Sequence, residues 1–243
     1  MLTMSPMGSG GAPMTPNVQD QTPLGQNYTL IDLGTLGGTG SGASGINASG
    51  QIVGSSLTTN YDTHGFIWDN GGMRDLGTLD GSESAALGLN DHGQVVGYAS
   101  SSNPNQRHAF LWENGVMHDL GSLGVNYSAA LSINNSKKIV GYSSGTTSGY
   151  RVAFLFSNNG MTSIGSLGGD SSSASCINNN DQIVGYAYVS NNVSYVPFLY
   201  QAGTMTNIGT LGGLYGLAMS INDNGQIVGQ SYAPHKSQPA DSV

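Results

Sequence analysis

The sequence predicts an all-β protein, a five-bladed β-propeller of four-stranded repeats about 44 residues long. The chain repeats itself five times at steps of 43 or 44 residues, which is the signature of a propeller or another repeat array. Gly accounts for 38 of the 243 residues, and only 8% of residues are charged. Turn formers at this density between short apolar runs are typical of all-β folds. No segment shows the periodicity of an amphipathic helix.

Three positions mark the repeat in every copy. A glycine closes an Ile/Val-Val-Gly triplet, and an asparagine stands seven residues before it. A Leu-Gly-Ser/Thr-Leu segment recurs at the same step, with Ile as its first residue in the last two copies. The glycines are Gly54, Gly97, Gly141, Gly185 and Gly229; the asparagines are Asn47, Asn90, Asn134, Asn178 and Asn222; the segments begin at Leu33, Leu76, Leu120, Ile164 and Ile208. Such recurring residues belong to the scaffold, so function is expected where the period is broken.

One copy, residues 84–123, shows the strands of a blade. We expect strands at residues 84–90, 94–99, 108–112 and 116–123, joined by turns and by a polar loop at 100–107. Four short strands within roughly 40–45 residues make a propeller blade. In the third strand, alternation puts Phe110 and Trp112 on one side and Ala109 and Leu111 on the other. Both faces are apolar, so each blade needs a neighbour on each side.

The hairpin after the recurring asparagine calls for a residue of positive φ, which glycine supplies. Copies one, two and five have Gly50, Gly93 and Gly225 there. Copies three and four have Lys137 and Asp181 instead. We expect those two turns to be strained or of another type.

The ends of the chain predict how the ring closes. Four copies are complete, at residues 39–79, 80–123, 124–167 and 168–211, whereas the fifth has only its first two strands, within 217–232. Tyr28 to Leu33 aligns with the fourth strand of the other copies, so the N- and C-terminal strands are expected to share the last blade. Its third strand should begin near Ala240, where no aromatic residue stands. The C-terminal stub, the N-terminal segment or a neighbouring chain are the alternatives for supplying that strand.

Residues 1–27 form a separate unit, an extended arm rich in Met, Pro and Gly, and residues 28–243 form the propeller. An arm of this composition cannot pack a core of its own. We therefore expect it to dock onto other protein subunits, in an oligomer or a multi-chain particle. The residues expected to make that contact are Met4, Met7, Pro13, Met14, Pro16 and Val18.

The third strands carry a short signature, which reads His108-Ala109-Phe110 in full and His64-Gly65-Phe66 in a degenerate form. Further degenerate copies are Val152-Ala153-Phe154 and Val196-Pro197-Phe198. With the flanking Ile-Asn-x-x-Gly-Gln-Ile-Val-Gly and Asp-Leu-Gly-Thr-Leu-Gly-Gly segments, residues 30–230 resemble the HAF-repeat family of probable extracellular repeat proteins. The strand order is also similar to the kelch-type blade. The resemblance implies a propeller-like β fold and an extracellular setting, and it implies no chemistry.

Charge and hydropathy exclude several classes of partner. The net charge is −8 with six Lys and Arg residues, so the clustered cations that nucleic acids and anionic membranes require are lacking. No stretch approaches the ~20 apolar residues of a membrane helix. Residues 1–30 contain no Lys or Arg, and no signal peptide is expected. The expected location is a virion or the extracellular space.

No constellation of catalytic, cofactor-binding or metal-binding residues stands out, so we expect no enzyme and no cofactor. His64 and His108 share a slot that valine fills in later copies, which favours a structural role. His118 precedes Asp119, and adjacent strand residues point to opposite faces, which argues against a catalytic pair. The lone Cys176 occupies a slot held by Gly or Ser elsewhere, and no His/Cys spacing suggests zinc.

The loops between the second and third strands vary from copy to copy, at residues 57–63, 100–107, 143–150 and 189–195. They carry Tyr61, Tyr150 and Tyr195 among small polar residues. Tyrosine in such surroundings suits stacking on sugar rings or contact with protein. Solvated loops without a ligand are the alternative.

The function expected first is a non-enzymatic structural or adhesive module. The arm would anchor it to a larger assembly, such as a phage virion in which it is a head-decoration, cement or fibre protein, with the propeller displayed outward. The alternative is a secreted, lectin-like propeller that binds carbohydrate through the loop tyrosines. An enzyme is expected least.

Overall fold

The structure is a computed structural model that describes residues 2–6, 28–103, 105–124, 126–145 and 149–234. These residues form strands joined by turns and loops, and they include no helix. The strands are β1 Leu2–Pro6, β2 Tyr28–Asp32, β3 Gly37–Ile46, β4 Ile52–Thr58, β5 Thr63–Asp69, β6 Gly72–Asp75, β7 Ser84–Leu89, β8 Val95–Ser100, β9 Arg107–Glu113, β10 Val116–Asp119, β11 Ser128–Ile133, β12 Ile139–Ser144, β13 Arg151–Ser157, β14 Gly160–Gly165, β15 Gly168–Ile177, β16 Ile183–Val189, β17 Tyr195–Gln201, β18 Thr204–Asn207, β19 Gly216–Ile221 and β20 Ile227–Ser231.

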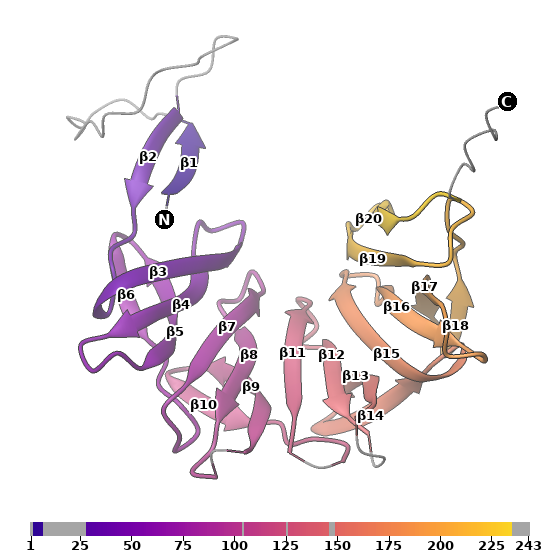
Figure 1. Cartoon of the computed structure of the whole chain (residues 1–243). Coiled ribbons are helices and arrows are strands. Elements are labelled where there is room, and N and C mark those ends of the chain that lie inside the picture. Colours follow the sequence, from indigo (N-terminus) through magenta and orange to yellow (C-terminus); the bar gives the residue numbers. More distant parts are fainter. Residues whose placement is uncertain (1, 7–27, 104, 125, 146–148, 235–243) are drawn as a thin grey trace, which may run out of the picture.

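Each complete repeat folds into one antiparallel sheet of four strands in sequential order. The four sheets are β3–β6, β7–β10, β11–β14 and β15–β18, and the fifth repeat contributes the two-stranded sheet β19–β20. Figure 1 shows the sheets following one another along an open arc, with β3 and β19 at its ends. The all-β class and the propeller-like succession of four-stranded sheets are therefore confirmed.

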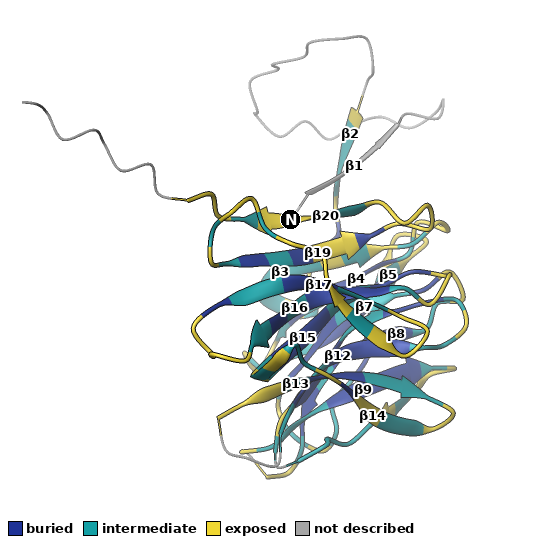
Figure 2. Ribbon diagram, turned by 90° about the vertical axis from the view of Figure 1, so that its right-hand side faces the viewer, coloured by how far each residue is buried: buried dark blue, intermediate teal, exposed yellow. Residues whose placement is uncertain are grey.

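The core lies between the sheets. The cluster between the first two sheets contains Val53 and Ile67 of the first sheet together with Phe110 and Trp112 of the second. Equivalent clusters join the second sheet to the third and the third to the fourth. The third-strand rings are wholly buried at Phe66, Phe110, Phe154 and Phe198. Figure 2 shows this burial along the middle of the stacked sheets, so each sheet is stabilised by its neighbours, as the two apolar faces predict.

The recurring glycine of each second strand lies against a bulge in the first strand. A Cβ atom on Gly97 would stand 1.9 Å from the carbonyl oxygen of Ala85, beside the register shift between Ala86 and Gly88. The other four copies show the same approach, at 1.9 to 2.1 Å. Only glycine lets the two backbones approach so closely, because no Cβ fits between them.

The turns in copies three and four keep the geometry of the glycine turns. Lys137 has φ +61° and Asp181 has φ +63°, close to the +71° of Gly93. The amide N of Lys137 donates to the carbonyl of Asn134 at 3.0 Å, as Gly93 donates to Asn90. The expectation of strain is confirmed and that of another turn type is wrong, because this hydrogen bond holds both residues in the left-handed region.

The structure departs from the predicted closure of the ring. β2, the expected fourth strand of the last blade, pairs with β1 of the N-terminal segment, but β1–β2 and β19–β20 are separate two-stranded sheets, and Figure 1 shows the two pairs apart. Val228 on β20 is 63% exposed, whereas the equivalent valines of the four complete sheets are fully buried. No third strand lies beside β20 among the described residues, so the ring is not closed.

β2 begins at Tyr28, where the described residues resume. Met4 lies on β1, so part of the expected arm is a paired strand. Met7, Pro13, Met14, Pro16 and Val18 lie outside the described residues.

Candidate functional site: a cleft of tyrosines and arginines

A cleft of about 620 Å³ opens between the second and third sheets. Its aromatic and charged lining consists of Tyr98, Arg107, Tyr127, Tyr142, Tyr150 and Arg151. Small residues, among them Asn126 and Ser144, complete it. The cleft thus combines flat aromatic faces with guanidinium and amide donors.

Backbone hydrogen bonds hold the walls of the cleft in place. The amide N of Arg107, at the start of β9, donates to the carbonyl of Asn126 at 2.8 Å. Tyr127, just before β11, accepts from the amide N of Ser144 on β12 at 2.7 Å. The first bond joins the second sheet to the segment that leads into the third sheet, and the second bond lies within the third repeat.

Both arginines stack on tyrosines. The Arg151 guanidinium lies 4.4 Å from the ring centre of Tyr142, and that of Arg107 lies 5.5 Å from the ring centre of Tyr98. Arg107 is also paired with Glu83, outside the cleft lining. Among the described residues no carboxylate pairs with Arg151, and none lines the cleft. The site is therefore locally cationic in an acidic protein.

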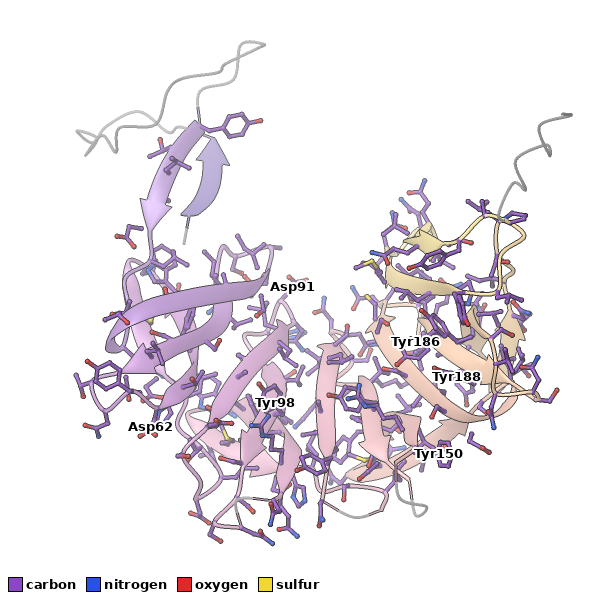
Figure 3. All side chains as sticks on the ribbon, viewed as in Figure 1. Asp62, Asp91, Tyr98, Tyr150, Tyr186 and Tyr188 are labelled. Carbon is purple, nitrogen blue, oxygen red and sulfur yellow. The ribbon has the colours of Figure 1, made fainter. Side chains whose placement is uncertain are left out.

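The three tyrosines expected from the variable loops lie in different places. Tyr150, 41% exposed, lines the cleft, whereas Tyr61, 73% exposed, lies on the first sheet's loop. Tyr195 packs in a tyrosine cluster between the fourth and fifth sheets, 5.4 Å from Tyr186 and 5.0 Å from Tyr215 between ring centres. Burial raises the pKa of the Tyr195 hydroxyl. Figure 3 shows Tyr150 on the third sheet, and Tyr98 and Tyr186 on the sheets to either side.

Sequence reasoning missed most of the cleft. Tyr98 and Tyr142 each follow the recurring glycine, and Arg107 and Arg151 each open a third strand. These are repeat positions, where the sequence predicts scaffold residues. The available signal was that the corresponding positions of the first repeat hold Ser55 and Thr63, so aromatic and cationic residues there are not scaffold requirements.

The histidines take part in pairs that sequence reasoning also missed. Nδ1 of His64 lies 2.8 Å from a carboxylate oxygen of Asp75, and Nδ1 of His108 lies 2.9 Å from Asp119. His118, which precedes Asp119, does not make this contact. The two pairs occupy equivalent positions of the first and second sheets, which is how scaffold residues are distributed.

The recurring asparagines tie the inner strands together. Nδ2 of Asn90 donates to the carbonyl of Asn134 at 3.1 Å, and Asn134 donates in the same way to Asn178. Beside this row, hydrogen bonds from Asn135 and the Ala48 amide lower the pKa of the Asp91 carboxyl. Hydrogen bonds from the backbone and side chain of Asn179 lower the pKa of the Asp223 carboxyl. These polar groups connect neighbouring sheets, so we assign them to the scaffold.

No group of three or more His, Cys, Asp or Glu side chains that could hold a metal ion occurs within the described ranges. Cys176 lies 3.9 Å from the Ser132 hydroxyl and 3.8 Å from the Ser220 hydroxyl, which fill its slot in the adjacent repeats. The part of the chain that the structure describes offers no helix long and apolar enough to cross a membrane.

The described fold and cleft define an all-β, propeller-like protein with a tyrosine and arginine site. No family model matches the chain, and no curated protein matches it. Among solved structures, the acylaminoacyl peptidase of Pyrococcus horikoshii in its orthorhombic crystal form is similar, with 12% identity and a TM-score of 0.47. The match covers 80% of this chain and 29% of that chain. A likeness of this size carries no argument, and the resemblance to HAF-repeat proteins stays a prediction.

Proposed function

We propose that this protein is a non-enzymatic adhesive module that binds carbohydrate in the cleft between its second and third sheets. The observation that carries the proposal is the pair of guanidinium-stacked tyrosines, Tyr98 with Arg107 and Tyr142 with Arg151. Tyrosine faces suit the apolar faces of sugar rings. Arginine and asparagine side chains supply donors for ring hydroxyls.

The test is calorimetric titration with saccharides found to bind the wild-type protein on a glycan array. Tyr142→Ala removes a stacking face from the cleft and is expected to weaken binding roughly tenfold. Tyr61→Ala is the matched control, because it removes the same side chain from an exposed loop away from the cleft. Equal affinities of both variants and the wild type would refute the cleft as the site.

The arm is proposed to anchor this module to a larger assembly, in a virion or at a cell exterior. The composition of residues 1–27 supports this. Replacing residues 7–27 with a short Gly/Ser linker keeps β1 and β2 and removes Met7, Pro13, Met14, Pro16 and Val18. The variant should fold, bind sugar and no longer co-sediment with the particle fraction of the producing culture. Unchanged co-sedimentation would exclude anchoring by residues 7–27.

The complete ring is proposed to have five blades, with β19, β20, β1 and β2 as the strands of the last blade. Register supports this arrangement. In complete sheets the third strand pairs with the fourth so that Phe66 opposes Asp75 and Phe110 opposes Asp119. β1 pairs with β2 so that Leu2 opposes Asp32, which aligns with those aspartates. β1 thus stands beside β2 in the register of a third strand.

A serine on the first strand of the first sheet also supports a preceding blade. In the second sheet the Ser84 hydroxyl accepts from the amide N of Gly65 on the preceding sheet and donates to Gly77. The Ser41 hydroxyl, in the same slot, donates to Gly34 at 2.8 Å. No described amide donates to Ser41, so its acceptor position is available to a third strand of a preceding blade.

Cysteine cross-linking tests the closure in a Cys176→Ser background. In the proposed sheet Val228 opposes Thr3, as Val53 opposes Ile67 in the first sheet, so Thr3→Cys with Val228→Cys should form an intramolecular disulfide. Met4→Cys with Val228→Cys is the control, because a shift of one residue turns the side chain to the other face. Cross-linking of neither pair, or of both equally, would exclude this register.

A further inference from the structure

A pair of side chains in contact occurs in three consecutive sheets, on the same side of the molecule as the cleft. The residue after the recurring glycine and the first residue of the third strand form this pair in three consecutive sheets. The pairs and their separations are Tyr98 with Arg107 at 5.5 Å, Tyr142 with Arg151 at 4.4 Å, and Tyr186 with Tyr195 at 5.4 Å. The cleft is therefore one part of a longer row of aromatic platforms.

Further tyrosines lie at the junctions between these sheets. Tyr127 forms an isolated parallel bridge with Arg107, and Tyr215 forms the equivalent bridge with Tyr195. Tyr127 is 48% exposed, and Tyr215 lies 5.0 Å from Tyr195 between ring centres. The row thus spans the second sheet to the fifth, with rings at two of the three junctions, because Ser171 holds the equivalent position between the third and fourth sheets.

The row has a defined beginning. The first sheet holds Ser55 and Thr63 at the two positions of the stacked pair. At the junction of the first and second sheets, the position of Tyr127 and Tyr215 is held by Glu83, which pairs with Arg107. Aromatic faces therefore start at the second sheet.

We propose that this row binds a linear acidic polysaccharide along several sugar residues, from the cleft to the Tyr195 cluster. The inference rests on the proposed carbohydrate-binding function. Platforms on three consecutive sheets match a polymer with a repeated apolar ring face. Arg151 is a cation without a carboxylate partner among the described residues, and guanidinium binds a carboxylate through two parallel hydrogen bonds. Two arginines do not neutralise a phosphate backbone, which favours a sugar acid over nucleic acid.

Length dependence is the first readout. Oligogalacturonates of increasing length are titrated into the full chain by calorimetry, with neutral gluco-oligosaccharides of equal length as the comparison. Affinity for the uronates should rise each time the oligosaccharide becomes long enough to reach a further aromatic platform. It should also exceed the affinity for neutral oligosaccharides of equal length. Equal binding of the shortest and longest uronates would overturn the extended row while leaving sugar binding in the cleft intact. Absence of binding to every saccharide would overturn both proposals.

Variants separate the two halves of the row. Tyr215→Ala should weaken binding of long uronates roughly tenfold and leave short ones unchanged, whereas Tyr142→Ala should weaken both. Arg151→Gln should reduce uronate affinity to that of the neutral series. Tyr61→Ala is the control for all three, and unfolding curves confirm that each variant folds. Unchanged uronate preference in Arg151→Gln, or equal binding of oligothymidylate, would contradict the acidic-sugar assignment.

Discussion

At the scale of single residues, the glycines are required for two different structural reasons. Gly97 is required because the first strand passes too close for a Cβ atom, whereas Gly50 has open space around its Cβ position and a φ of +81°. The first requirement is steric contact with another strand, and the second is local backbone conformation. Substitution separates the two.

Gly97→Ala is expected to destabilise the protein by about 3 kcal/mol or more, because its Cβ would meet the carbonyl oxygen of Ala85. Gly50→Ala should cost only roughly 1 kcal/mol, the penalty of a left-handed alanine. Urea unfolding of both variants measures the difference. Similar losses for the two would contradict this distinction.

Comparing equivalent positions of the repeats shows which features of the structure the sequence predicts. Pro197 has no amide hydrogen to donate, and Gly216, at the slot of Ser84, has no hydroxyl to accept. The recurring glycines and asparagines, and the third-strand rings of the four complete copies, were predictable because they repeat at a fixed step along the chain. The stacking of Arg151 on Tyr142 was not, because the two residues belong to different strands.

At the scale of elements, the pairing of third and fourth strands brings together side chains that are eleven residues apart, such as His108 and Asp119. The equivalent positions of the fourth sheet hold Val196 and Asn207. The third sheet holds Val152 and Ser163 there, so histidine coincides with aspartate and valine with an uncharged polar residue.

His108→Val with Asp119→Asn converts the second sheet's pair into that of the fourth sheet. The loss of unfolding free energy in the double variant should be smaller than the sum of the losses in the two single variants. The difference, which is the coupling energy of the pair, is expected to be roughly 0.2–1 kcal/mol, the range for partly exposed ion pairs. Urea unfolding of all four proteins forms the cycle. A coupling of zero would mean that the contact contributes nothing to stability.

At the scale of the whole molecule, hydrogen bonds between neighbouring sheets make stability depend on pH. The pKa values of Asp91 and Asp223 are lowered from the usual 3.8 by bonds that cross from one sheet to the next. Because the folded pKa lies below the unfolded value, the stabilisation is complete above about pH 4 and is lost as pH falls through the folded pKa.

Asp91→Asn with Asp223→Asn should therefore flatten the fall in unfolding free energy between about pH 5 and about pH 3. Asparagine is compatible with this slot, since Asn135 and Asn179 occupy it in the third and fourth repeats. Urea titrations at both pH values provide the measurement. An unchanged slope would show that other carboxylates dominate acid unfolding.

By itself, the sequence determined the all-β class, the repeat boundaries, the strands and the buried rings, because these follow from period, turn residues and side-chain alternation within one copy. Only the tertiary structure decided that Tyr98, Arg107, Tyr142 and Arg151 share one cleft, that β1 pairs with β2, and that Val228 is exposed. Those features depend on how one sheet stacks on the next and on which edge finds a partner, and neither is encoded in the pattern of a single repeat.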